Sequence, residues 1–265
     1  MRKPTSFGRI TALICLFSFL IALAIYFWCL HFFRDEFPSV GRLTKEFPEV
    51  VYLGQGPAGD EQIEIHFRKR RPLGWVPLSA VSAGTLAAIV VSEDWAFYQH
   101  RGYDPAQMSE AIKADIRKKK FARGASTITQ QVVKNLFLEK DKKIWRKIKE
   151  LYLAIELEKA LGKRKILEIY LNIAQWGRGV YGIGAASMYY FKKTPDQLTA
   201  REGAFLAMLL PSPVRYNQSF RRGELTPFAR SQIRSILEKM VRAQRLSAED
   251  FSREITEPLV FRNQS

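Results

Sequence analysis

The sequence predicts a mostly α-helical protein, in which one N-terminal membrane-spanning helix precedes a helical domain. The first observation is that residues 10–33 contain no Asp, Glu, Lys or Arg. A helix of that length is roughly 36 Å long, enough to cross the ~30 Å hydrocarbon core of a bilayer. The second is that beyond residue 76 apolar residues recur at helical spacing, while the alternation typical of strands is nearly absent. The third is that 47% of the 265 residues are hydrophobic, which suffices to bury a core.

The apolar segment is predicted to be an anchor rather than a cleaved signal peptide. A signal peptide has an apolar core of about 7–15 residues and then a small-residue cleavage site. This segment is longer and ends in the bulky residues 28–33. Arg2, Lys3 and Arg9 precede it without an acidic residue. The positive-inside rule therefore predicts that residues 1–9 form a cytoplasmic tail and that the rest of the chain is exported.

Cysteine and histidine content argues against a disulfide scaffold and against a metal centre built by the protein. Cys15 and Cys29 both lie inside the apolar segment, 14 residues apart. About 21 Å of helix would separate them, so they cannot pair with each other. Two cysteines are too few for a thiolate zinc site. The three histidines, His31, His66 and His100, are far apart in the sequence, so a multi-histidine centre is not expected.

Residues 34–75 are predicted to connect the anchor to a domain at residues 76–265. The connector contains four prolines and the basic run 68–71. Within it, the alternating residues 63–67 are typical of a short strand.

The domain is predicted to consist of helices in one piece. Prolines, capping residues and apolar stripes mark where each helix begins and ends. The predicted segments are Pro77 to about Glu93, a helix opened by Pro105, Thr127–Leu138 with Ser126 as N-cap, about Lys142 to Ala160, Lys163–Ile173, a run from the capping box Thr199–Glu202 to Leu210 that Pro211 stops, and a last long helix headed by Thr226-Pro227.

The charge of the chain points to an anionic partner. There are 42 Lys and Arg residues against 26 Asp and Glu residues, a formal charge of +16. Residues 113–149 contain 13 basic and 3 acidic residues, a local excess of 10. Nucleic acid, an anionic membrane surface or a diphosphate substrate would each explain that concentration. Export behind a membrane anchor argues against nucleic acid.

Residues 91–104 contain the first candidate site. Glu93 and Asp94 end an apolar helix and precede a turn rich in aromatic residues. Apolar surroundings disfavour a charged carboxylate and raise its pKa towards that of a useful base. Taken alone, an acidic pair at a helix end is more often solvated or ion-paired, and this alternative stays open here.

Residues 123–135 contain the second candidate. Thr127, Gln131 and Lys134 follow the i, i+4, i+7 spacing and share one helix face. A helix N-terminus preceded by glycine, with hydroxyls and a lysine nearby, can hold an anionic oxygen group. The alternative is an ordinary capped amphipathic helix.

The third candidate is the cluster of Arg146, Lys147 and Glu150. Their i, i+3 and i, i+4 spacings put the three on one helix face. A surface salt-bridge cluster is the alternative that usually holds for such spacing.

Together these stretches resemble the signature motifs of the peptidoglycan glycosyltransferases, glycosyltransferase family 51. The resemblance covers roughly residues 75–220, with one mild departure at Ala125, where many members have a second glycine. Because the chain ends soon after the matched region, it is most similar to the monofunctional members. The matching residues are Glu93-Asp94 with Phe97, His100 and Gly102; Gly124 to Gln131 with Lys134-Asn135; Arg146-Lys147 with Glu150; Ile166-Leu167-Glu168 and Tyr170-Leu171-Asn172; and Gly177, Gly182, Ala185-Ala186 and Tyr190-Phe191.

The resemblance implies a lysozyme-like helical glycosyltransferase domain that polymerises lipid II, a disaccharide-pentapeptide on undecaprenyl diphosphate, with inversion at the anomeric carbon. It implies that Glu93 is the general base and that Glu150, on the donor side, assists departure of the diphosphate either directly or by ordering a cation. The residues it implies for substrate binding are Asp94, Phe97 and His100, which shape the first motif; Thr127, Gln130, Gln131 and Asn135 in the donor pocket; and Lys134, Arg146 and Lys147 at the diphosphate.

The same resemblance implies a bacterial inner-membrane protein with its N-terminus inside and a periplasmic catalytic domain. Its partners would be lipid II, the lipid-linked glycan and the membrane, and cell-wall synthesis or division proteins are open candidates. A divalent cation, Mg²⁺ or Mn²⁺, at the diphosphate is left open. The rival function is a lysozyme-type glycan hydrolase, which would have no need for the basic concentration or for tethering beside lipid.

Overall fold

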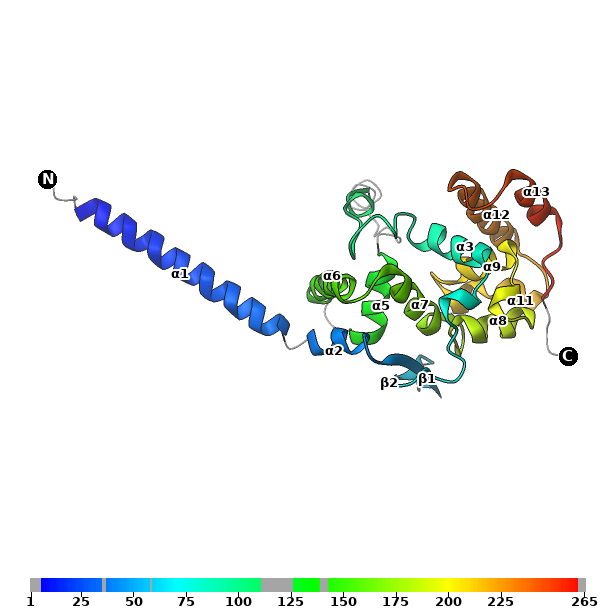
Figure 1. The fold of residues 1–265 in the computed structure, drawn as a ribbon, viewed down its shortest axis with the longest axis horizontal. Coiled ribbons are helices and arrows are strands. Elements are labelled where there is room, and N and C mark those ends of the chain that lie inside the picture. The colour runs from blue at the N-terminus through cyan, green and yellow to red at the C-terminus, as the bar shows by residue number, and fades with distance from the viewer. Residues whose placement is uncertain (1–5, 35–36, 58, 111–125, 139–142, 262–265) are drawn as a thin grey trace.

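The computed structural model describes residues 6–34, 37–57, 59–110, 126–138 and 143–261, with some side chains in α1, α2 and α6 excepted. The chain is mostly helical, as predicted, and Figure 1 shows α1 outside the body that the other helices form. Its elements are α1 (Ser6–Arg34), α2 (Phe37–Arg42), β1 (Phe47–Gln55), β2 (Glu61–Arg68), η1 (Leu78–Ala80), α3 (Ala83–Glu93), α5 (Ile128–Phe137), α6 (Lys143–Ala160), α7 (Lys163–Ile173), β3 (Gln175–Gly177), β4 (Val180–Tyr181), α8 (Ile183–Phe191), η2 (Pro195–Gln197), α9 (Ala200–Leu209), α10 (Pro213–Tyr216), α11 (Gln218–Arg222), α12 (Pro227–Arg242) and α13 (Ala248–Thr256).

The predicted anchor lies within α1, a continuous helix of 29 residues. In the described part of the chain, no helix offers an apolar stretch long enough to cross a membrane. The anchor at residues 10–33 therefore stays a prediction. Cys15 is a free, exposed cysteine.

The predicted connector contains an ordered antiparallel hairpin of β1 and β2, in which Val50 pairs with Ile65. The strand predicted at residues 63–67 is confirmed as part of β2. The hairpin is followed by a segment that α7 holds in place. Glu168 of α7 accepts hydrogen bonds from Trp75 Nε1 and the Leu78 amide, both at 3.1 Å. Two residues of one matched motif, Glu168 and Asn172, thus fix the entry to the helical domain, because Asn172 binds the backbone of Val76 in both directions.

Most helix boundaries match the prediction, and α7 matches at both ends. The start at Pro77 is wrong: the chain forms the short turn η1, and α3 begins after Ser82, whose side chain accepts from the Thr85 amide. The N-cap of α5 is Thr127 rather than Ser126. Thr127 and Gln130 form a reciprocal capping box, which satisfies amides that helix geometry leaves unpaired.

Several elements were not predicted, namely α2, β1, β3, β4, α8, η2, α10, α11 and the final helix α13. β3 and β4 are too short for an alternating pattern to emerge. The helix that Pro105 opens is described only at residues 105–110. Residues 111–125, which include much of the basic concentration and the start of the second motif, lie outside the described residues.

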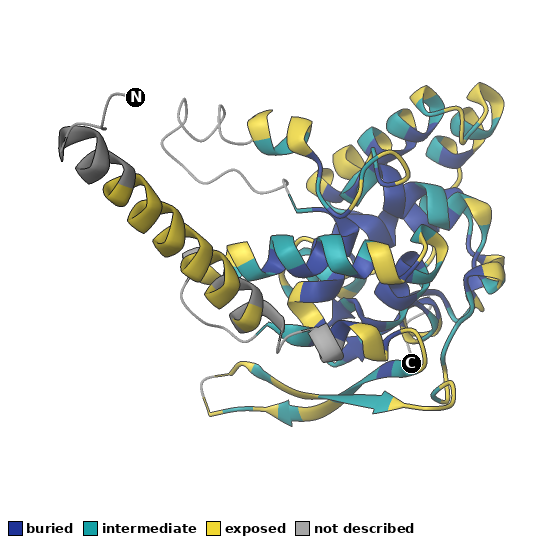
Figure 2. Cartoon of the chain, turned by 60° about the vertical axis from the view of Figure 1, so that its left-hand side comes forward, coloured by how far each residue is buried: buried dark blue, intermediate teal, exposed yellow. Residues whose placement is uncertain are grey.

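The core lies where α3, α9 and α12 pack together and where α5 contacts α6 and α7. Figure 2 shows buried residues gathered in these central helices, whereas the described part of α1 is exposed. α3 and α9 approach closely at Gly203, where a Cβ would lie only 2.6 Å from the Thr85 Cα atom. Gln131 of α5 reaches Glu93 at the end of α3, so the first two candidate motifs lie next to each other.

Candidate active site

Glu93 is the last residue of α3 and is partly exposed. Gln131 of α5 donates from Nε2 to Glu93 Oε2 at 2.9 Å. The hydroxyl of Tyr170 on α7 donates in turn to Gln131 Oε1 at 3.2 Å. Burial raises the pKa of Tyr170 well above its ordinary value, so this hydroxyl remains a donor. Three helices therefore fix one carboxylate through a chain of neutral donors.

The surroundings of Glu93 favour its protonated form more than water does. Burial is the largest cause and raises the pKa of Glu93 above its ordinary value of 4.5. The hydrogen bond from Gln131 and the charges of Lys134 and Lys239 lower the pKa, while Asp94 raises it. The net shift is upward, as expected for a carboxylate suited to accept a proton.

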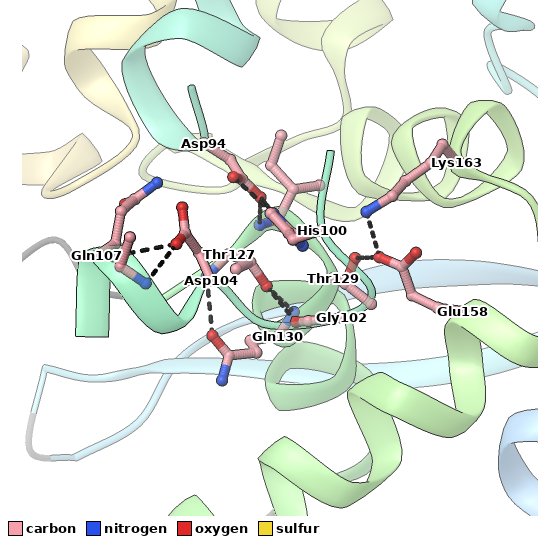
Figure 3. A network of polar contacts seen from close by, with 12 residues as sticks. Asp94, His100, Gly102, Asp104, Gln107, Thr127, Thr129, Gln130, Glu158 and Lys163 are labelled. Atoms are coloured by element: carbon pink, nitrogen blue, oxygen red, sulfur yellow. Dashed lines mark hydrogen bonds and ion pairs between the residues drawn. The ribbon is translucent and has the colours of Figure 1, made fainter. Parts of the chain in front are cut away.

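Asp94 is the neighbour of Glu93 but points into the protein. His100 Nε2 donates to both of its oxygens at 2.9 and 3.1 Å, and the Ile128 amide donates to Oδ2 at 3.0 Å (Figure 3). The side chains of Asp94 and His100 are 0% and 7% exposed. Burial raises the pKa of Asp94, and the bonds from His100 and Ile128 oppose that shift. Asp94 and His100, together with the fully buried Phe97, thus hold the segment after Glu93 in place.

The start of α5 uses most of its polar groups internally. Its first amide, on Ile128, binds Asp94, and the Gln130 amide binds Thr127 Oγ1. Thr127 Oγ1 also donates to the Gly102 carbonyl oxygen at 2.7 Å. Thr127 and Gln130 are 2% and 0% exposed. These two residues therefore cap the helix, and a role for them in a donor pocket stays a prediction; Nε2 of Gln130 is buried without a hydrogen-bond partner among the described residues.

The third candidate cluster lies on α6, which packs against α5. Lys147 Nζ donates to Glu150 Oε1 at 2.5 Å and to Ser126 Oγ at 3.2 Å. The side chain of Lys147 is 46% exposed and that of Glu150 only 5%. Nε of Arg146 is buried and has no hydrogen-bond partner in the described part of the chain. The cluster is thus more than a solvated face, because it combines a buried carboxylate with an exposed ammonium.

The structure separates the predicted residues into two groups. Gln131 and Lys134 act on Glu93, whereas Arg146 and Lys147 lie with Glu150. Lys134 and Asn135 are exposed on α5 and are open to a substrate. Both groups meet at α5, which carries Gln131 and Lys134 and whose N-cap Thr127 follows Ser126, a partner of Lys147.

Sequence reasoning missed two residues of the site. Lys239, on α12, is close enough to lower the pKa of Glu93, although it lies far away in the sequence. Helical periodicity predicted α12 but not which of its residues faces α3. Tyr170 was part of a matching motif, and its contact with Gln131 gives it a place in the site.

No group of three or more His, Cys, Asp or Glu side chains that could hold a metal ion occurs among the described residues. Among the described residues of this cluster the carboxylate is that of Glu150, and it already binds Lys147 through Oε1. These residues do not fit a cation site built by the protein alone.

Comparison with known proteins gives consistent matches. A family model described as transglycosylase matches residues 60–241. A biosynthetic peptidoglycan transglycosylase of Chromobacterium violaceum is 36% identical over 211 residues, 77% of this chain and 88% of that protein. A protein of the same description from Shewanella amazonensis is 46% identical over 142 residues, 54% of this chain and 58% of that protein. Penicillin-binding protein 1F of Bacillus subtilis is 42% identical over 159 residues, 60% of this chain but 22% of that longer protein.

Proposed function

Because the chain belongs to the transglycosylase family, we propose that it polymerises lipid II into the glycan strands of peptidoglycan. It is a glycosyltransferase of peptidoglycan synthesis, and the family supports this activity over that of a lysozyme-type hydrolase. The observation that carries the proposal is the state of the Glu93 carboxylate. Burial raises its pKa, and the neutral amide of Gln131 holds it in position.

In the proposed reaction, Glu93 accepts the proton of the sugar hydroxyl on the incoming lipid II. The hydroxyl oxygen forms a bond to the anomeric carbon of the growing chain as the bond from that carbon to the diphosphate oxygen breaks. The lipid diphosphate leaves with the bonding electron pair, and the anomeric centre inverts. A positioned base contributes ~10²–10⁴-fold to such a step.

The departing diphosphate gains negative charge, which nearby cations stabilise. Lys134 on α5 and the Arg146–Lys147 pair on α6 supply such charges, and their helices are in contact. Glu150 orders Lys147 through their direct hydrogen bond. We derive no step through a divalent cation, since the described residues form no metal site.

A peptidoglycan-synthesis enzyme works in the cell envelope, and we propose that residues 10–33 anchor it in the inner membrane with the catalytic domain outside. The support is the absence of charged residues from this segment and the basic residues that precede it. Reporter fusions to both ends of the full chain test the orientation. A C-terminal reporter active only in the cytoplasm would contradict it.

The deciding experiment incubates the purified full chain with labelled lipid II and separates the products on a gel. A ladder of glycan strands is expected from the parent, and Glu93→Gln serves as the matched inactive control. A second incubation, with finished glycan strands, tests the hydrolase alternative. Release of small fragments from those strands, with no ladder from lipid II, would overturn the proposal.

A further inference from the structure

A largely buried ion pair beside the site joins α6 to α7. Lys163 Nζ lies 2.6 Å from Glu158 Oε1, and Thr129 Oγ1 on α5 donates to the same oxygen at 2.6 Å (Figure 3). The side chains of Glu158 and Lys163 are 7% and 18% exposed. Neither Glu158 nor Lys163 takes part in the proposed reaction.

Lys163 also contacts the segment that follows Glu93. Its Nζ lies 4.4 Å from the centroid of the Phe97 ring, a cation–π contact made away from water. Phe97 is fully buried, and its amide donates to the Asp94 carbonyl oxygen at 3.0 Å. The same segment rests on α6 at Gly102, where a Cβ would lie 2.8 Å from the Ala154 backbone.

The ion pair therefore connects both partners of the hydrogen bond that holds Glu93. On one side, Glu158 accepts a hydrogen bond from Thr129, which lies two residues before Gln131 on α5. On the other side, Lys163 makes a cation–π contact with Phe97, which lies four residues after Glu93. Glu158 thus contacts the helix that carries Gln131, and Lys163 contacts the segment that follows Glu93, so the pair links the two elements that the Gln131–Glu93 hydrogen bond joins.

We propose that Glu158 and Lys163 are a positioning pair that holds Glu93 in the orientation needed to accept the proton of the sugar hydroxyl. This role rests on the proposed function, and neither residue touches substrate. A buried ion pair is weak evidence for stability alone, since its desolvation offsets its attraction. Small displacements of a catalytic group are costly, because a shift of ~1 Å can reduce the rate ~100-fold.

The test compares kcat and KM for lipid II in four variants of the full chain. Lys163→Met is expected to lower kcat on the order of tenfold while KM stays within about twofold, since only a group acting in the transition state is disturbed. Lys163→Arg keeps the charge and is expected to restore kcat to within about threefold of the parent. Glu158→Gln is expected to lower kcat in the same way as Lys163→Met. The fourth variant, Glu158→Gln with Lys163→Met, removes both charges and leaves no buried charge unpaired.

Two controls separate positioning from general stability. Lys159→Met breaks the ion pair with Glu156 on the same helix, where the lysine side chain is 67% exposed, and should leave kcat unchanged. Ser247→Ala removes the N-cap of α13 and lowers the melting temperature without changing kcat. Hydrogen exchange at the amides of Phe97 and Ile128 should be faster in Lys163→Met than in either control.

The outcomes distinguish the two proposals. A parent that forms no glycan from lipid II overturns the proposed function and this role with it. An active parent with unchanged kcat in Lys163→Met and in the double variant overturns the positioning role alone. Should Lys163→Met fail to fold, the double variant decides: a folded double variant with the kcat of the parent also overturns it.

Discussion

Glu93 and Glu150 are both carboxylates at the predicted site, and each lies near a lysine, yet their surroundings differ. Glu93 receives its hydrogen bond from a neutral amide, and Lys134 acts on it only through its electric field. Glu150 binds the ammonium of Lys147 directly and is 5% exposed. The carboxylate of Glu93, which is held by a neutral donor and has a raised pKa, is suited to take up a proton, whereas one oxygen of Glu150 is occupied by the ammonium of Lys147. The difference supports the proposal that Glu93 is the base and that Glu150 orders Lys147.

Replacing each carboxylate by its amide tests this comparison most strongly. Glu93→Gln is expected to lower turnover of lipid II by about 10³-fold or more, because a positioned general base contributes ~10²–10⁴-fold. Glu150→Gln is expected to lower the turnover of lipid II less than Glu93→Gln does, since the cations Lys147 and Arg146 remain. Both rates come from the gel assay on the folded variants. Near-normal turnover by Glu93→Gln would move the base elsewhere, with Glu150 as the next candidate.

Removing the cation near Glu93 and removing the cation near Glu150 should affect the pH dependence of the rate differently. Lys134→Ala and Arg146→Ala are each expected to reduce turnover on the order of 100-fold, about 2.7 kcal/mol for one lost transition-state contact. Lys134→Ala should also move the acidic limb of the pH–rate profile upward, because the charge of Lys134 lowers the pKa of Glu93. Arg146→Ala should leave that limb in place. Rates within about threefold of the parent for both folded variants would show that these residues are solvated surface charges without a role at the diphosphate.

Removing the neutral donor to Glu93 is expected to have a smaller effect. Gln131→Leu deletes a hydrogen bond that lowers the pKa of Glu93, so the acidic limb of kcat/KM should move to higher pH. Turnover at neutral pH should fall about tenfold, as the carboxylate also loses its orientation. Tyr170→Phe is the matched control, since it keeps the bond from Gln131 to Glu93. An unchanged profile in Gln131→Leu would show that this bond does not tune the base.

The parts that the sequence predicted best are those that depend on neighbouring residues. Helix α7 and the capping box at Thr199 were predicted because periodicity and caps are local signals. The correct N-cap of α5 also had a local signal in the sequence. Thr127 stands three residues before Gln130, whereas Ser126 stands three residues before Thr129. A capping box needs Glu or Gln at that third position.

The parts that could not be predicted depend on contacts between distant segments. Local pattern does not distinguish Glu93 from Asp94, and only the family resemblance singled out Glu93. In the structure Glu93 binds Gln131, whereas Asp94 binds His100 inside the protein. The approach of Lys239 to Glu93 depends on how α12 packs against α3. For the same reason, the sequence does not indicate that Glu158 and Lys163 contact Thr129 and Phe97.

The smallest expected effect concerns stability, where the two carboxylates should again differ. The pKa of Glu93 is raised in the folded protein, so between its ordinary pKa of 4.5 and the raised value the folded state binds more protons than the unfolded state. The free energy of unfolding then falls as pH rises through that interval. Above it, the charged carboxylate is a constant cost to the folded state.

Glu93→Gln removes this cost while keeping an oxygen that can accept from Gln131. The variant is therefore expected to melt at a higher temperature than the parent at pH 7, and the difference should disappear well below pH 4.5, where the carboxyl group of the parent is protonated in both states. Glu156→Gln is the matched control, because it neutralises a carboxylate of an exposed surface pair on α6 and should change the melting temperature little. Glu150→Gln should instead lower the melting temperature, since it breaks the pair with Lys147. If Glu93→Gln were less stable than the parent at pH 7, the carboxylate would be stabilised by its surroundings. Glu93 would then be a structural carboxylate rather than a general base whose charged form destabilises the folded state.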